Sequence, residues 1–510
     1  MTPDTPSDAP TADAPRPEAP RPEARGPRGF QDRRGPDLIA ERRIVERVSA
    51  VYERWGFEPL ETSAFEYADA LGKFLPDADR PNEGVFALQD DDDQWMALRY
   101  DLTAPLARYA AQNWETLPKP FRRYAFGPVW RNEKPGPGRF REFIQCDADT
   151  VGSDRPEADA EILALAVEGL TAAGLDRDQA QIKVSNRKLF DGLFGAGGID
   201  DPAQRLTALR AIDKFDRLGW EGVSALLGEG RLDESGDYTK GAQLPTAVIS
   251  TVERFLASAG RANLSRADTL SAVAGAGDLG AAGEEALKEL QAIDTALGIM
   301  GVDQTAVRFD PTVVRGLEYY TGVVFEAELL LPTTDEKGRP VRFGSIGGGG
   351  RYDDLVARFT GQSVPATGFS FGVSRLAAAL RASGRDPAGE ARGPVVVIAF
   401  SDADLAHYLG AVAELRAAGI AAELYLGRAG MKAQMKYADR RGAPVAVMLG
   451  GDEIAAGTVT LKDLDAGRRL SQAVSDNAEW KQARPGQQTL PRDQMVAAIR
   501  AILEGSSISD

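Results

Sequence analysis

The sequence of 510 residues contains a single cysteine and a single histidine. One cysteine, Cys146, excludes an internal disulfide and any zinc site built from several cysteines. Because it alternates with Ile144 in an apolar run, we expect a packed side chain. The histidine, His407, lies in a segment with the pattern of an amphipathic helix, and there is no second imidazole for a catalytic pair or a histidine metal site. The chemistry of this protein must therefore rest on Arg, Lys, Tyr, carboxylates and backbone dipoles.

Long apolar runs and positive charge are also scarce. The longest apolar run, Val395 to Phe400, is far too short to cross a bilayer, so we expect no membrane span and a cytoplasmic protein. The formal net charge of -16 argues against broad, nonspecific affinity for nucleic acid, because phosphate contacts are the main source of such binding. Residues 1–28 are rich in Pro, Ala, Asp and Glu without a hydrophobic face, which predicts a disordered tail with neither a secretory signal nor a mitochondrial transit peptide.

One stretch, Phe121 to Asp149, has the pattern of two long strands that flank a Pro/Gly loop. Pro135 and Pro137 in that loop donate no ladder hydrogen bond, so neither strand continues and an antiparallel hairpin is predicted. Because side chains alternate between the two faces of a strand, one sheet face gathers charged, amide and aromatic residues. These residues are Arg131 and Glu133 on the first strand, and Arg141, Phe143, Gln145, Asp147 and Asp149 on the second.

This sheet face has the chemistry of a binding surface. Guanidinium groups suit a phosphate, an aromatic ring suits a base, and an amide with carboxylates suits an amino group or a polar heterocycle. The alternative interpretation is the solvated face of a half-exposed sheet.

Periodicity and chain breakers predict further elements before the hairpin. A helix is predicted over residues 35–55, followed by an edge or interface strand around Pro59. Asp101 and Thr103 precede a helix that starts at about the latter residue, and capping of this helix is their function-neutral interpretation.

After the hairpin, a helix is predicted over 156–173 and a short strand over 181–186. Between about Arg187 and Met300 the pattern changes to short helices rich in Ala, Gly and Leu, without a chemical motif. We interpret residues 187–300 as a helical insertion.

Three later segments are rich in glycine or in polar residues. Arg315 stands beside a tight turn at Gly316, and Tyr319 and Tyr320 lead into a strand. The run GSIGGGGRYDDL lacks the G-x-x-x-x-G-K-[ST] order of a P-loop, so it indicates close backbone approach or a structural sheet crossing. In ATGFSFGVSRL, small residues on one strand face leave room for a flat ligand that Arg375 could cover.

From Gly393 onward, after a linker at 381–392, strands and helices alternate as in an α/β unit. Four basic residues recur at helical spacing, which predicts a basic stripe that is either a footprint for an acidic partner or a solvated helix face. They are Arg428, Lys432, Lys436 and Arg440. A last amphipathic helix, MVAAIRAIL, could pack on either domain.

Several segments resemble, in sequence and in order, those of the histidyl-tRNA synthetases, a class II aminoacyl-tRNA synthetase family. The segments are FRRYAFGPVWRNE with GRFREFIQCDADTVG, VVRGLEYYTGVVFE, GGGGRYDDL and GFSFGVSRL. RGLEYYTG and GGRYD look like the two signatures that separate the histidine enzymes from other class II members. The likeness covers roughly residues 29 to 465 and includes KAQMKYADRRGAPVAVMLG, which is similar to the family's anticodon-binding domain.

The resemblance implies an α+β fold in which a class II catalytic core of antiparallel sheet and flanking helices precedes a C-terminal α/β anticodon-binding domain. The implied domains are 29–385 for catalysis, with the insertion at 187–300, and 393–470 for anticodon binding, followed by a C-terminal extension at 471–510. A homodimer formed through the region around Pro59 is also implied.

The resemblance further implies a histidine–tRNA ligase, which activates L-histidine with ATP and Mg2+ and transfers it to the 3' end of tRNA(His). The implied catalytic residues are Arg131 and Arg315. The implied ATP-binding residues are Arg131, Glu133, Arg139, Phe143 and Arg375. The implied histidine-binding residues are Asp101, Thr103, Gln145, Asp149, Tyr319, Tyr320 and Tyr352. The implied tRNA-binding residues are Arg428, Lys432, Lys436 and Arg440, whereas the ligands of Mg2+ are not implied.

Two alternatives remain open from the sequence. A noncatalytic, histidine-binding paralogue that regulates ATP phosphoribosyltransferase would lack the anticodon-binding domain and part of the ATP-side arginines, whereas this chain retains both. Another class II synthetase, for proline or threonine, is disfavoured by RGLEYYTG and GGRYD. The chain departs from the family pattern at Asp149, where many bacterial members have glutamate, and at Ser374, which replaces the usual glutamate before the last arginine.

Overall fold

The structure of the chain is a computed structural model, which describes residues 22–71, 84–134, 140–232, 236–259, 264–316, 320–333, 339, 344–385, 387, 392–473 and 486–505. Contacts divide the chain into two compact units, Met1–Gly389 and Glu390–Asp510. No described helix combines the length and the apolar composition that a membrane span needs. Most of the predicted tail, residues 1–21, lies outside the described residues.

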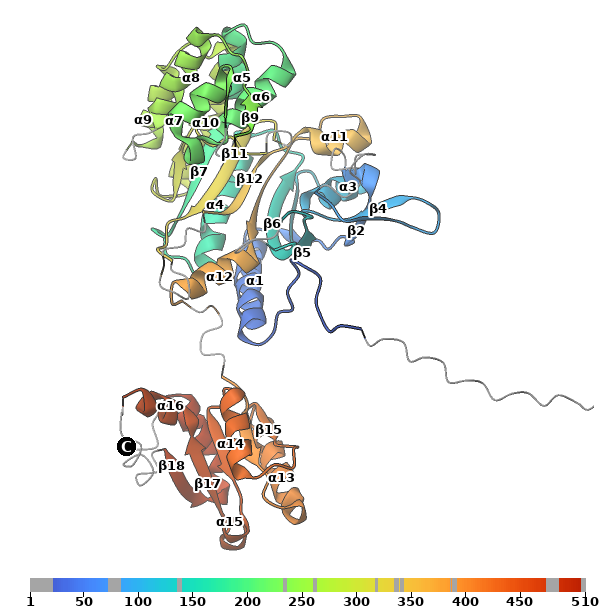
Figure 1. The fold of residues 1–510 in the computed structure, drawn as a ribbon, viewed down its shortest axis with the longest axis vertical. Helices are drawn as coiled ribbons and strands as arrows, with labels where there is room; N and C mark the ends of the chain where they lie inside the picture. Colours follow the sequence, from blue (N-terminus) through green and yellow to red (C-terminus); the bar gives the residue numbers. More distant parts are fainter. Residues whose placement is uncertain are drawn as a thin grey trace, which may run out of the picture. The chain divides into compact units, whose positions relative to one another are not determined.

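The first unit is built on an eight-stranded mixed sheet whose central neighbours are antiparallel (Figure 1). Its order is β1 (Glu58–Pro59), β5 (Phe121–Trp130), β6 (Glu142–Val151), β13 (Ala366–Gly372), β12 (Ser345–Arg351), β11 (Val323–Leu329), β7 (Ala180–Asn186) and β10 (Val307–Phe309). The outermost pairs, β1 with β5 and β7 with β10, are parallel. The predicted edge strand at Pro59 is confirmed, as is the antiparallel-rich core.

The predicted hairpin lies within this sheet. β5 pairs with β6 in antiparallel register, with Arg123 opposite Asp149. On its other edge β6 pairs with β13, which places Ser370 opposite Asp147. Because β6 is hydrogen-bonded along both edges, its side chains are held in fixed positions. Cys146 is buried in this strand, as predicted.

Two long helices pack together in this unit. α1 (Pro36–Arg54) and α4 (Pro156–Ala172) both begin with proline, whose missing N–H is not needed in the first turn. α1 buries Ile44, Val48 and Tyr52. The two helices predicted in these regions are therefore confirmed. The other helices near the sheets are α2 (Ala68–Leu71), α3 (Thr103–Asn113), α11 (Asp354–Thr360) and α12 (Val373–Ala382).

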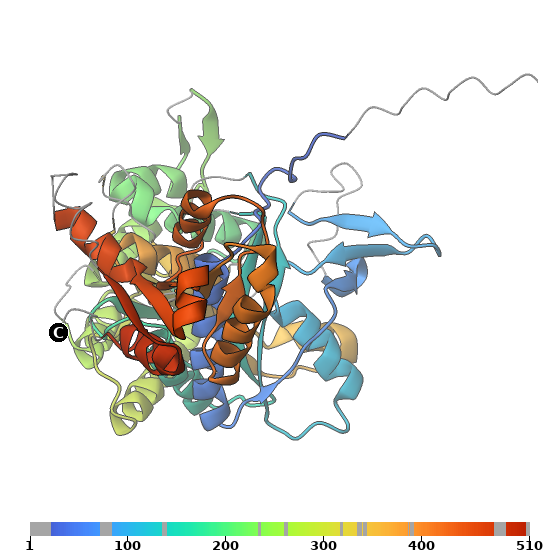
Figure 2. The same ribbon diagram turned by 90° about the horizontal axis from the view of Figure 1, so that it is seen from below.

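A small antiparallel sheet precedes α3. It consists of β2 (Phe65–Tyr67), β4 (Trp95–Leu98) and β3 (Ala87–Gln89), in that order. The turn between β3 and β4 is closed by Asp90 Oδ1, which accepts a hydrogen bond from the amide of Asp92 at 3.0 Å. Figure 2 shows this pair of strands, in light blue, extending away from the main sheet.

The predicted insertion at 187–300 is largely helical (Figure 1). Its helices are α5 (Arg187–Ala196), α6 (Pro202–Ile212), α7 (Phe215–Leu227), α8 (Thr246–Ala259), α9 (Arg266–Ala274) and α10 (Gly280–Ile299). A short hairpin of β8 (Gly230–Leu232) and β9 (Tyr238–Lys240), which the pattern did not predict, projects from these helices (Figure 2). α5 and α10 pack closely at Gly192, where a Cβ atom would lie 1.9 Å from the carbonyl oxygen of Leu279.

The second unit contains a five-stranded sheet. Its order is β15 (Ala422–Leu424), β14 (Val395–Ile398), β16 (Val445–Met448), β17 (Thr458–Asp463) and β18 (Gln487–Pro491). β15, β14 and β16 are parallel and alternate in sequence with α13 (Leu405–Ala417) and α14 (Met431–Arg440), as predicted for an α/β unit. The other α-helices among the described residues of this unit are α15 (Gly451–Ala456), α16 (Leu464–Ala473) and α18 (Met495–Leu503).

The C-terminal residues belong to this second sheet and its core. β18 pairs antiparallel with β17, and α18 buries Met495, Ile499 and Ile502 among the strands' apolar side chains. The described residues after 486 therefore complete the second unit, whereas the sequence interpretation placed 471–510 in a separate extension. Four of the five positions of β18 are exposed, so the strand carries no apolar alternation that would reveal it.

Candidate active site

A cavity of about 670 Å3 lies against the large sheet of the first unit. Its wall is formed by β6, β11, β12 and β13 together with the start of α3. The predicted site residues that line it are Asp101, Thr103, Arg131, Glu133, Phe143, Gln145, Arg315, Tyr320 and Arg375. The cavity therefore brings together most of the residues that the sequence assigned to one site.

The glycine run forms part of this wall as strand β12. At Gly349 a Cβ atom would lie 2.0 Å from the carbonyl oxygen of Gly368 on β13, and at Gly347 it would lie 2.9 Å from the Phe369 ring. The glycines are thus needed for the close approach of these two paired strands. The same missing side chains leave space in the cavity above β12.

Arg131 and Phe143 are neighbours in the cavity wall. The guanidinium carbon of Arg131 is 5.2 Å from the centre of the Phe143 ring, and Arg131 Nε donates to Tyr100 O at 3.3 Å. Arg375, in the first turn of α12, donates from Nη1 to Ser345 O at 2.8 Å. Two guanidinium groups and an aromatic ring therefore share one space, an arrangement suited to a ligand with phosphates and a flat ring.

Arg315 is paired with a carboxylate on β11. Its Nη2 donates to Glu326 Oε1, and the Arg315 side chain remains 51% exposed. Gly316 has a φ of 56°, and a Cβ atom there would lie 2.3 Å from the Tyr320 ring, so the turn requires glycine. This turn brings Arg315 and Tyr320 to the same cavity. Burial raises the pKa of Tyr320, so its hydroxyl keeps its proton.

Asp101 and Thr103 lie at the N-terminus of α3. Asp101 Oδ1 accepts hydrogen bonds from the amides of Thr103 at 3.1 Å and Ala104 at 2.9 Å, which satisfies two free donors of the helix. Burial raises the pKa of Asp101, and these amide donors oppose the shift. The predicted helix cap is confirmed, and both residues also line the cavity.

Gln145, Ser370, Asp147 and Thr103 form a connected polar group, hereafter the Asp147 cluster. Gln145 Nε2 donates to Ser370 Oγ at 2.9 Å, and the Ser370 hydroxyl donates to Asp147 Oδ1. Thr103 Oγ1 lies 3.4 Å from Asp147 Oδ2. Burial raises the pKa of Asp147 to about 7, while the Arg123 guanidinium opposes the shift.

Asp149 and Tyr352 contact each other but are not among the described residues that line the cavity. The Tyr352 hydroxyl donates to Asp149 Oδ1, and Arg123 Nη2 pairs with Asp149 Oδ2 at 2.9 Å. Arg123 Nη2 also donates to Leu102 O at 2.9 Å. This placement differs from the expectation that Asp149 and Tyr352 would both line the histidine pocket, because a buried arginine already occupies the Asp149 carboxylate.

Two predicted site residues, Arg139 and Tyr319, lie outside the described residues. The structure adds Arg123 and Glu326, to which the sequence assigned no role, and it adds a hydrogen bond to Asp147 for Ser370, which was predicted only as a small residue that leaves room for a ligand. The hairpin register contains the signal for Arg123, which stands directly opposite an aspartate of β6. The other two lie on strands that meet the predicted face only after folding, so no local pattern reveals them.

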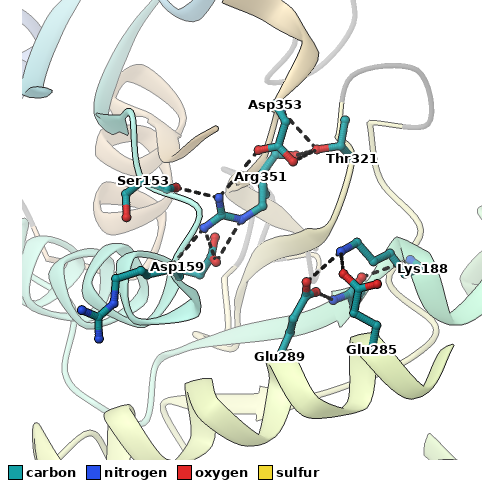
Figure 3. Close-up of polar contacts among 10 residues, drawn as sticks. Ser153, Asp159, Lys188, Glu285, Glu289, Thr321, Arg351 and Asp353 are labelled. Atoms are coloured by element: carbon teal, nitrogen blue, oxygen red, sulfur yellow. Dashed lines mark hydrogen bonds and ion pairs between the residues drawn. The ribbon is translucent and has the colours of Figure 1, made fainter. Parts of the chain in front are cut away.

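A buried network holds the turn before β11 against the end of β12 (Figure 3). Arg351 donates from Nη2 to Asp159 Oδ2 at 2.6 Å and from Nη1 to Ser153 O at 2.8 Å. The amide of Thr321 donates to Arg351 O at 2.8 Å, and its hydroxyl donates to Asp353 Oδ2 at 2.9 Å. Arg351 and Asp159 are both buried. The network thus links α4 to the segment that carries Tyr320 and to the end of β12, which Tyr352 directly follows.

The helical insertion is attached beside the same turn. Arg187, the first residue of α5, donates from Nη1 to Tyr320 O at 3.1 Å and from its amide to Gly322 O at 2.9 Å. Lys188 pairs with two glutamates of α10 (Figure 3). They are Glu285, at 2.6 Å, and Glu289, at 2.7 Å. The base of the insertion is therefore in direct contact with the turn that brings Tyr320 to the cavity.

In the second unit, the predicted basic residues are exposed. Lys432, Lys436 and Arg440 recur every fourth residue on α14. Arg428 lies before this helix, which begins at Met431, so the helical stripe has three members and Arg428 belongs to the preceding loop.

The chain matches known families over both units. The family described as Histidyl-tRNA synthetase matches residues 29–376, and the Anticodon binding domain matches residues 394–501. The histidine–tRNA ligase of Caulobacter vibrioides is 70% identical over 479 residues, covering 94% of this chain and 96% of that relative. The histidine–tRNA ligase of Brucella ovis is 54% identical over 486 residues, with the same coverage of both chains.

Solved structures share the fold. The histidyl-tRNA synthetase from Nostoc superposes with a TM-score of 0.69 at 26% identity, covering 94% of this chain and 99% of that chain. A protein described as an ATP phosphoribosyltransferase regulatory subunit/histidyl-tRNA synthetase, from Bacillus halodurans, superposes with a TM-score of 0.63 at 23% identity and covers 82% of this chain and 97% of that chain. At 23% identity, the similarity to the Bacillus halodurans protein shows a shared fold and no more.

Proposed function

The chain belongs to the histidyl-tRNA synthetase family, and we propose that the cavity of its first unit binds ATP and L-histidine side by side. Its activity is that of a histidine–tRNA ligase, which uses ATP as a substrate. The observation that carries the assignment to this cavity is that Arg131, Arg315 and Arg375 share one space of about 670 Å3 with Asp101 and Gln145. Such a volume is typical of small-molecule sites.

The proposed reaction needs charge stabilisation more than proton transfer. The carboxylate of histidine attacks the α-phosphorus of ATP, the bond to the outer phosphates breaks, and pyrophosphate leaves as histidyl-adenylate forms. This carboxylate is already ionised at neutral pH, so no general base is required. The terminal ribose hydroxyl of the tRNA then attacks the adenylate.

Two arginines are the proposed catalytic residues. Arg131 follows β5, and Arg315 precedes β11, so they approach the cavity from different parts of the sheet. We assign both to the α-phosphate, where negative charge increases in the transition state. Guanidinium groups held by hydrogen bonds to Tyr100 and Glu326 can stabilise this charge without reorganising.

The remaining ATP contacts are proposed from the same wall. Phe143 offers a ring face and Glu133 a carboxylate for the adenine, and Arg375 would lie over the adenine and the γ-phosphate. Arg139 is assigned to the outer phosphates on the family likeness. Mg2+ would enter with ATP, because the described residues contain no group of three or more Asp, Glu, His or Cys that could hold it and phosphate oxygens are common Mg2+ ligands. The ion would neutralise part of the phosphate charge.

The histidine pocket is proposed at the polar part of the cavity. A neutral imidazole has one donor and one acceptor, which a tyrosine hydroxyl and a carboxylate can satisfy together. An apolar amino acid would leave these groups unpaired, and this supports strong rejection. The residues proposed to bind histidine are Asp101, Thr103, Gln145, Asp149, Tyr319, Tyr320 and Tyr352. For Asp149 and Tyr352, contact with histidine is proposed for the complex, since they do not line the cavity described above.

The second unit is the proposed reader of the tRNA anticodon. It matches the anticodon-binding domain, and its exposed basic stripe supplies the positive charge that an RNA backbone attracts. The residues proposed to contact tRNA are Arg428, Lys432, Lys436 and Arg440. A local basic surface of this kind is compatible with a formal net charge of -16 for the whole chain.

We further propose a cytoplasmic homodimer, in which a second copy covers the region around Pro59. β1 is the outermost strand of the large sheet, and both of its residues are exposed. Large apolar side chains are exposed on β2, which follows β1 in the chain, and on β5, with which β1 pairs: Phe65, Tyr67 and Phe126 are 40%, 54% and 41% exposed. An edge strand beside exposed aromatic residues is suited to an interface between copies. Light scattering on the purified chain tests this, and a monomer at micromolar concentration would contradict it.

The alternative function, a noncatalytic, histidine-binding regulator of ATP phosphoribosyltransferase, is not favoured. The chain retains residues 394–501 as an anticodon-binding domain, and Arg131, Arg315 and Arg375 all line the cavity. A histidine sensor would need neither of these features.

ATP–pyrophosphate exchange without tRNA, across a panel of the twenty amino acids, tests the proposed site chemistry. Exchange with histidine alone is the expected result. It would assign the reaction and the amino-acid pocket together. A protein that binds histidine but exchanges with no amino acid would be a sensor, and the proposal would fail.

A further inference from the structure

A second cavity, of about 310 Å3, lies beside β5 in the first unit and contains a buried arginine without an assigned task. Arg99, which directly follows β4, is 7% exposed in the wall of this cavity. Glu61 and Thr62, in the segment after β1, also line it. The apolar part of the wall consists of Leu60, Leu102, Ala125, Phe126, Pro128 and Ile144.

The Arg99 guanidinium is held by backbone carbonyl groups from two segments. Nε donates to Pro128 O at 3.0 Å, and Nη1 donates to Thr62 O at 2.8 Å. Nη2 lies over Gly127, where a Cβ atom would be 2.5 Å away, so a side chain at this position would displace the guanidinium. Among the described residues, Nη2 has no hydrogen-bond acceptor and Arg99 forms no ion pair. One side of the guanidinium therefore faces the cavity without an acceptor.

A buried guanidinium without a carboxylate is costly, because its charge has lost most of its hydration. Burial lowers the pKa of Arg99, and the negative charges of Asp147 and Glu61 oppose this shift from a longer range than an ion pair. The usual partner of a guanidinium in a protein is a carboxylate or a phosphate, because two parallel N–H groups match two oxygen atoms. Arg99 therefore lacks an anion, and the cavity beside it has space for one.

The cavity lies in the surface that the proposed homodimer would bury. Leu60 directly follows β1, and Phe126, which is 41% exposed, is part of the cavity wall. Two identical chains assemble most often about a two-fold axis, so that the same patch of each chain faces the other. A carboxylate at the rim of this patch is then brought to the arginine of the second copy.

Glu61 is the carboxylate that meets this description. It lines the cavity, is exposed, and forms no ion pair among the described residues. Its charge acts on Arg99, so it is near the guanidinium without pairing with it in its own chain. Glu58, on β1, is also exposed but is not part of the cavity wall.

On the proposed homodimer, we infer that the cavity at Arg99 is an anion-binding site that takes a carboxylate of a second copy, the partner subunit's Glu61. By symmetry the interface contains two such pairs. The pair would also support the wall of the active-site cavity, because Arg99 O accepts the amide of Trp130 at 3.0 Å. The next carbonyl, Tyr100 O, accepts Arg131 Nε at 3.3 Å. Dimer formation thus completes the support of a proposed catalytic arginine.

The test mixes two variants that each remove one half of the pair. Arg99→Gln and Glu61→Gln are purified with tags of different mass, and fluorescence-detected sedimentation measures the dimer dissociation constant of each. We expect each variant to raise this constant about a hundredfold, which is about tenfold for each of two hydrogen bonds to a charged group. A mixed dimer retains one intact pair of Arg99 with Glu61. Native mass spectrometry of an equal mixture should therefore show more mixed dimers than the half that random pairing gives.

Glu58→Gln is the matched control, because it removes an exposed carboxylate from the same surface outside the cavity. Its dissociation constant should stay unchanged, and it should show no such preference for mixed dimers with Arg99→Gln. If Arg99→Gln does not fold, Arg99→Lys replaces it in the mixture. Lysine keeps the positive charge but loses the two-pronged geometry, so the excess of mixed dimers should be smaller but still above random pairing.

Two results would overturn the inference. Random pairing of the Arg99 and Glu61 variants would mean that the pair forms within one chain, which gains nothing from a mixed dimer. Dissociation constants that both variants leave unchanged would mean that no carboxylate of a second copy reaches the cavity. A free carboxylate would then be the occupant if sodium acetate raises the melting temperature more than sodium chloride does at equal ionic strength. A monomeric unmodified chain would instead refute the proposed homodimer, independently of Arg99.

Discussion

Arg315 Nη2 donates a hydrogen bond to Glu326 Oε1 in the wall of the cavity that we assign to ATP and histidine. This pair keeps a guanidinium group at the cavity while half of the arginine side chain, 51%, stays exposed. A cation held in this way can meet an incoming phosphate with little movement of the backbone.

Replacing Arg315 by alanine is expected to stop activation while histidine binding stays close to normal. The charge that Arg315 would stabilise grows only during the reaction, so the loss should fall on kcat, by about 10²–10³-fold as for one oxyanion donor. Pyrophosphate exchange measures kcat, and calorimetry measures the Kd of histidine. Arg315→Lys is the control, since it keeps the positive charge but loses the planar, two-pronged donor geometry of the guanidinium group. Its kcat should lie between those of the unmodified chain and the alanine variant. Near-normal exchange by the alanine variant would remove the proposed catalytic role.

The buried pair of Arg351 and Asp159 is expected to control both stability and the histidine pocket. Asp159→Ala leaves the buried Arg351 guanidinium with only the more distant Asp353 carboxylate, at 3.6 Å, which should destabilise the first unit by about 3–5 kcal/mol. Arg351 O also accepts the amide of Thr321, beside Tyr320, so KM for histidine should rise more than KM for ATP. Thermal unfolding and pyrophosphate exchange measure the two effects.

The double variant Arg351→Met with Asp159→Leu removes both charges and is the control for this prediction. It should recover most of the lost melting temperature, because apolar pairs of similar volume are often neutral replacements for buried ion pairs. A double variant as unstable as Asp159→Ala would show that the unpaired charge is not the cause.

The stability of the chain should fall with rising pH because of Asp147. Burial raises its pKa from 3.8 to about 7, so the folded chain keeps a proton that the unfolded chain loses between these values. Folding then takes up a proton in this window, and stability decreases as pH rises through it. Asp147→Asn removes this cost, so its melting temperature relative to the unmodified chain should increase between about pH 5 and about pH 8. A difference in melting temperature that is the same at both pH values would contradict the assignment of this raised pKa to Asp147. The control Asp178→Asn, at an exposed residue of the first unit, should show no such trend.

Local rules were sufficient for the elements that position most of the cavity wall. Prolines at 135 and 137 and strand alternation predicted the hairpin, Gly316 predicted the turn beside Arg315, and capping chemistry predicted the start of α3. Each depends on a few neighbouring residues, and the structure keeps all three.

Features that depend on pairing between distant segments were not predictable in this way. Asp149 was expected in the cavity, but Arg123, opposite it on β5, takes its carboxylate into a buried ion pair. Ser370 meets Asp147 only because β13 pairs with β6 across more than two hundred residues of sequence. The strand β18 was missed because its exposed residues carry no apolar period, and its place follows from pairing with β17. Tertiary pairing, not local propensity, decides these positions.

The exposed stripe on α14 should set the affinity for tRNA without affecting activation. Lys432→Ala with Lys436→Ala is expected to raise KM for tRNA in aminoacylation, whereas pyrophosphate exchange, which involves no tRNA, should stay unchanged. Each lost phosphate contact lowers the slope of log affinity against log salt by about 0.7–0.9, so the double variant should lose about 1.4–1.8 from the slope. Lys462→Ala, on β17 of the same unit, is the matched control and should keep the full slope. A stripe that meets only solvent would instead give the same slope for all three proteins, because no counterions would be released from the RNA at these positions.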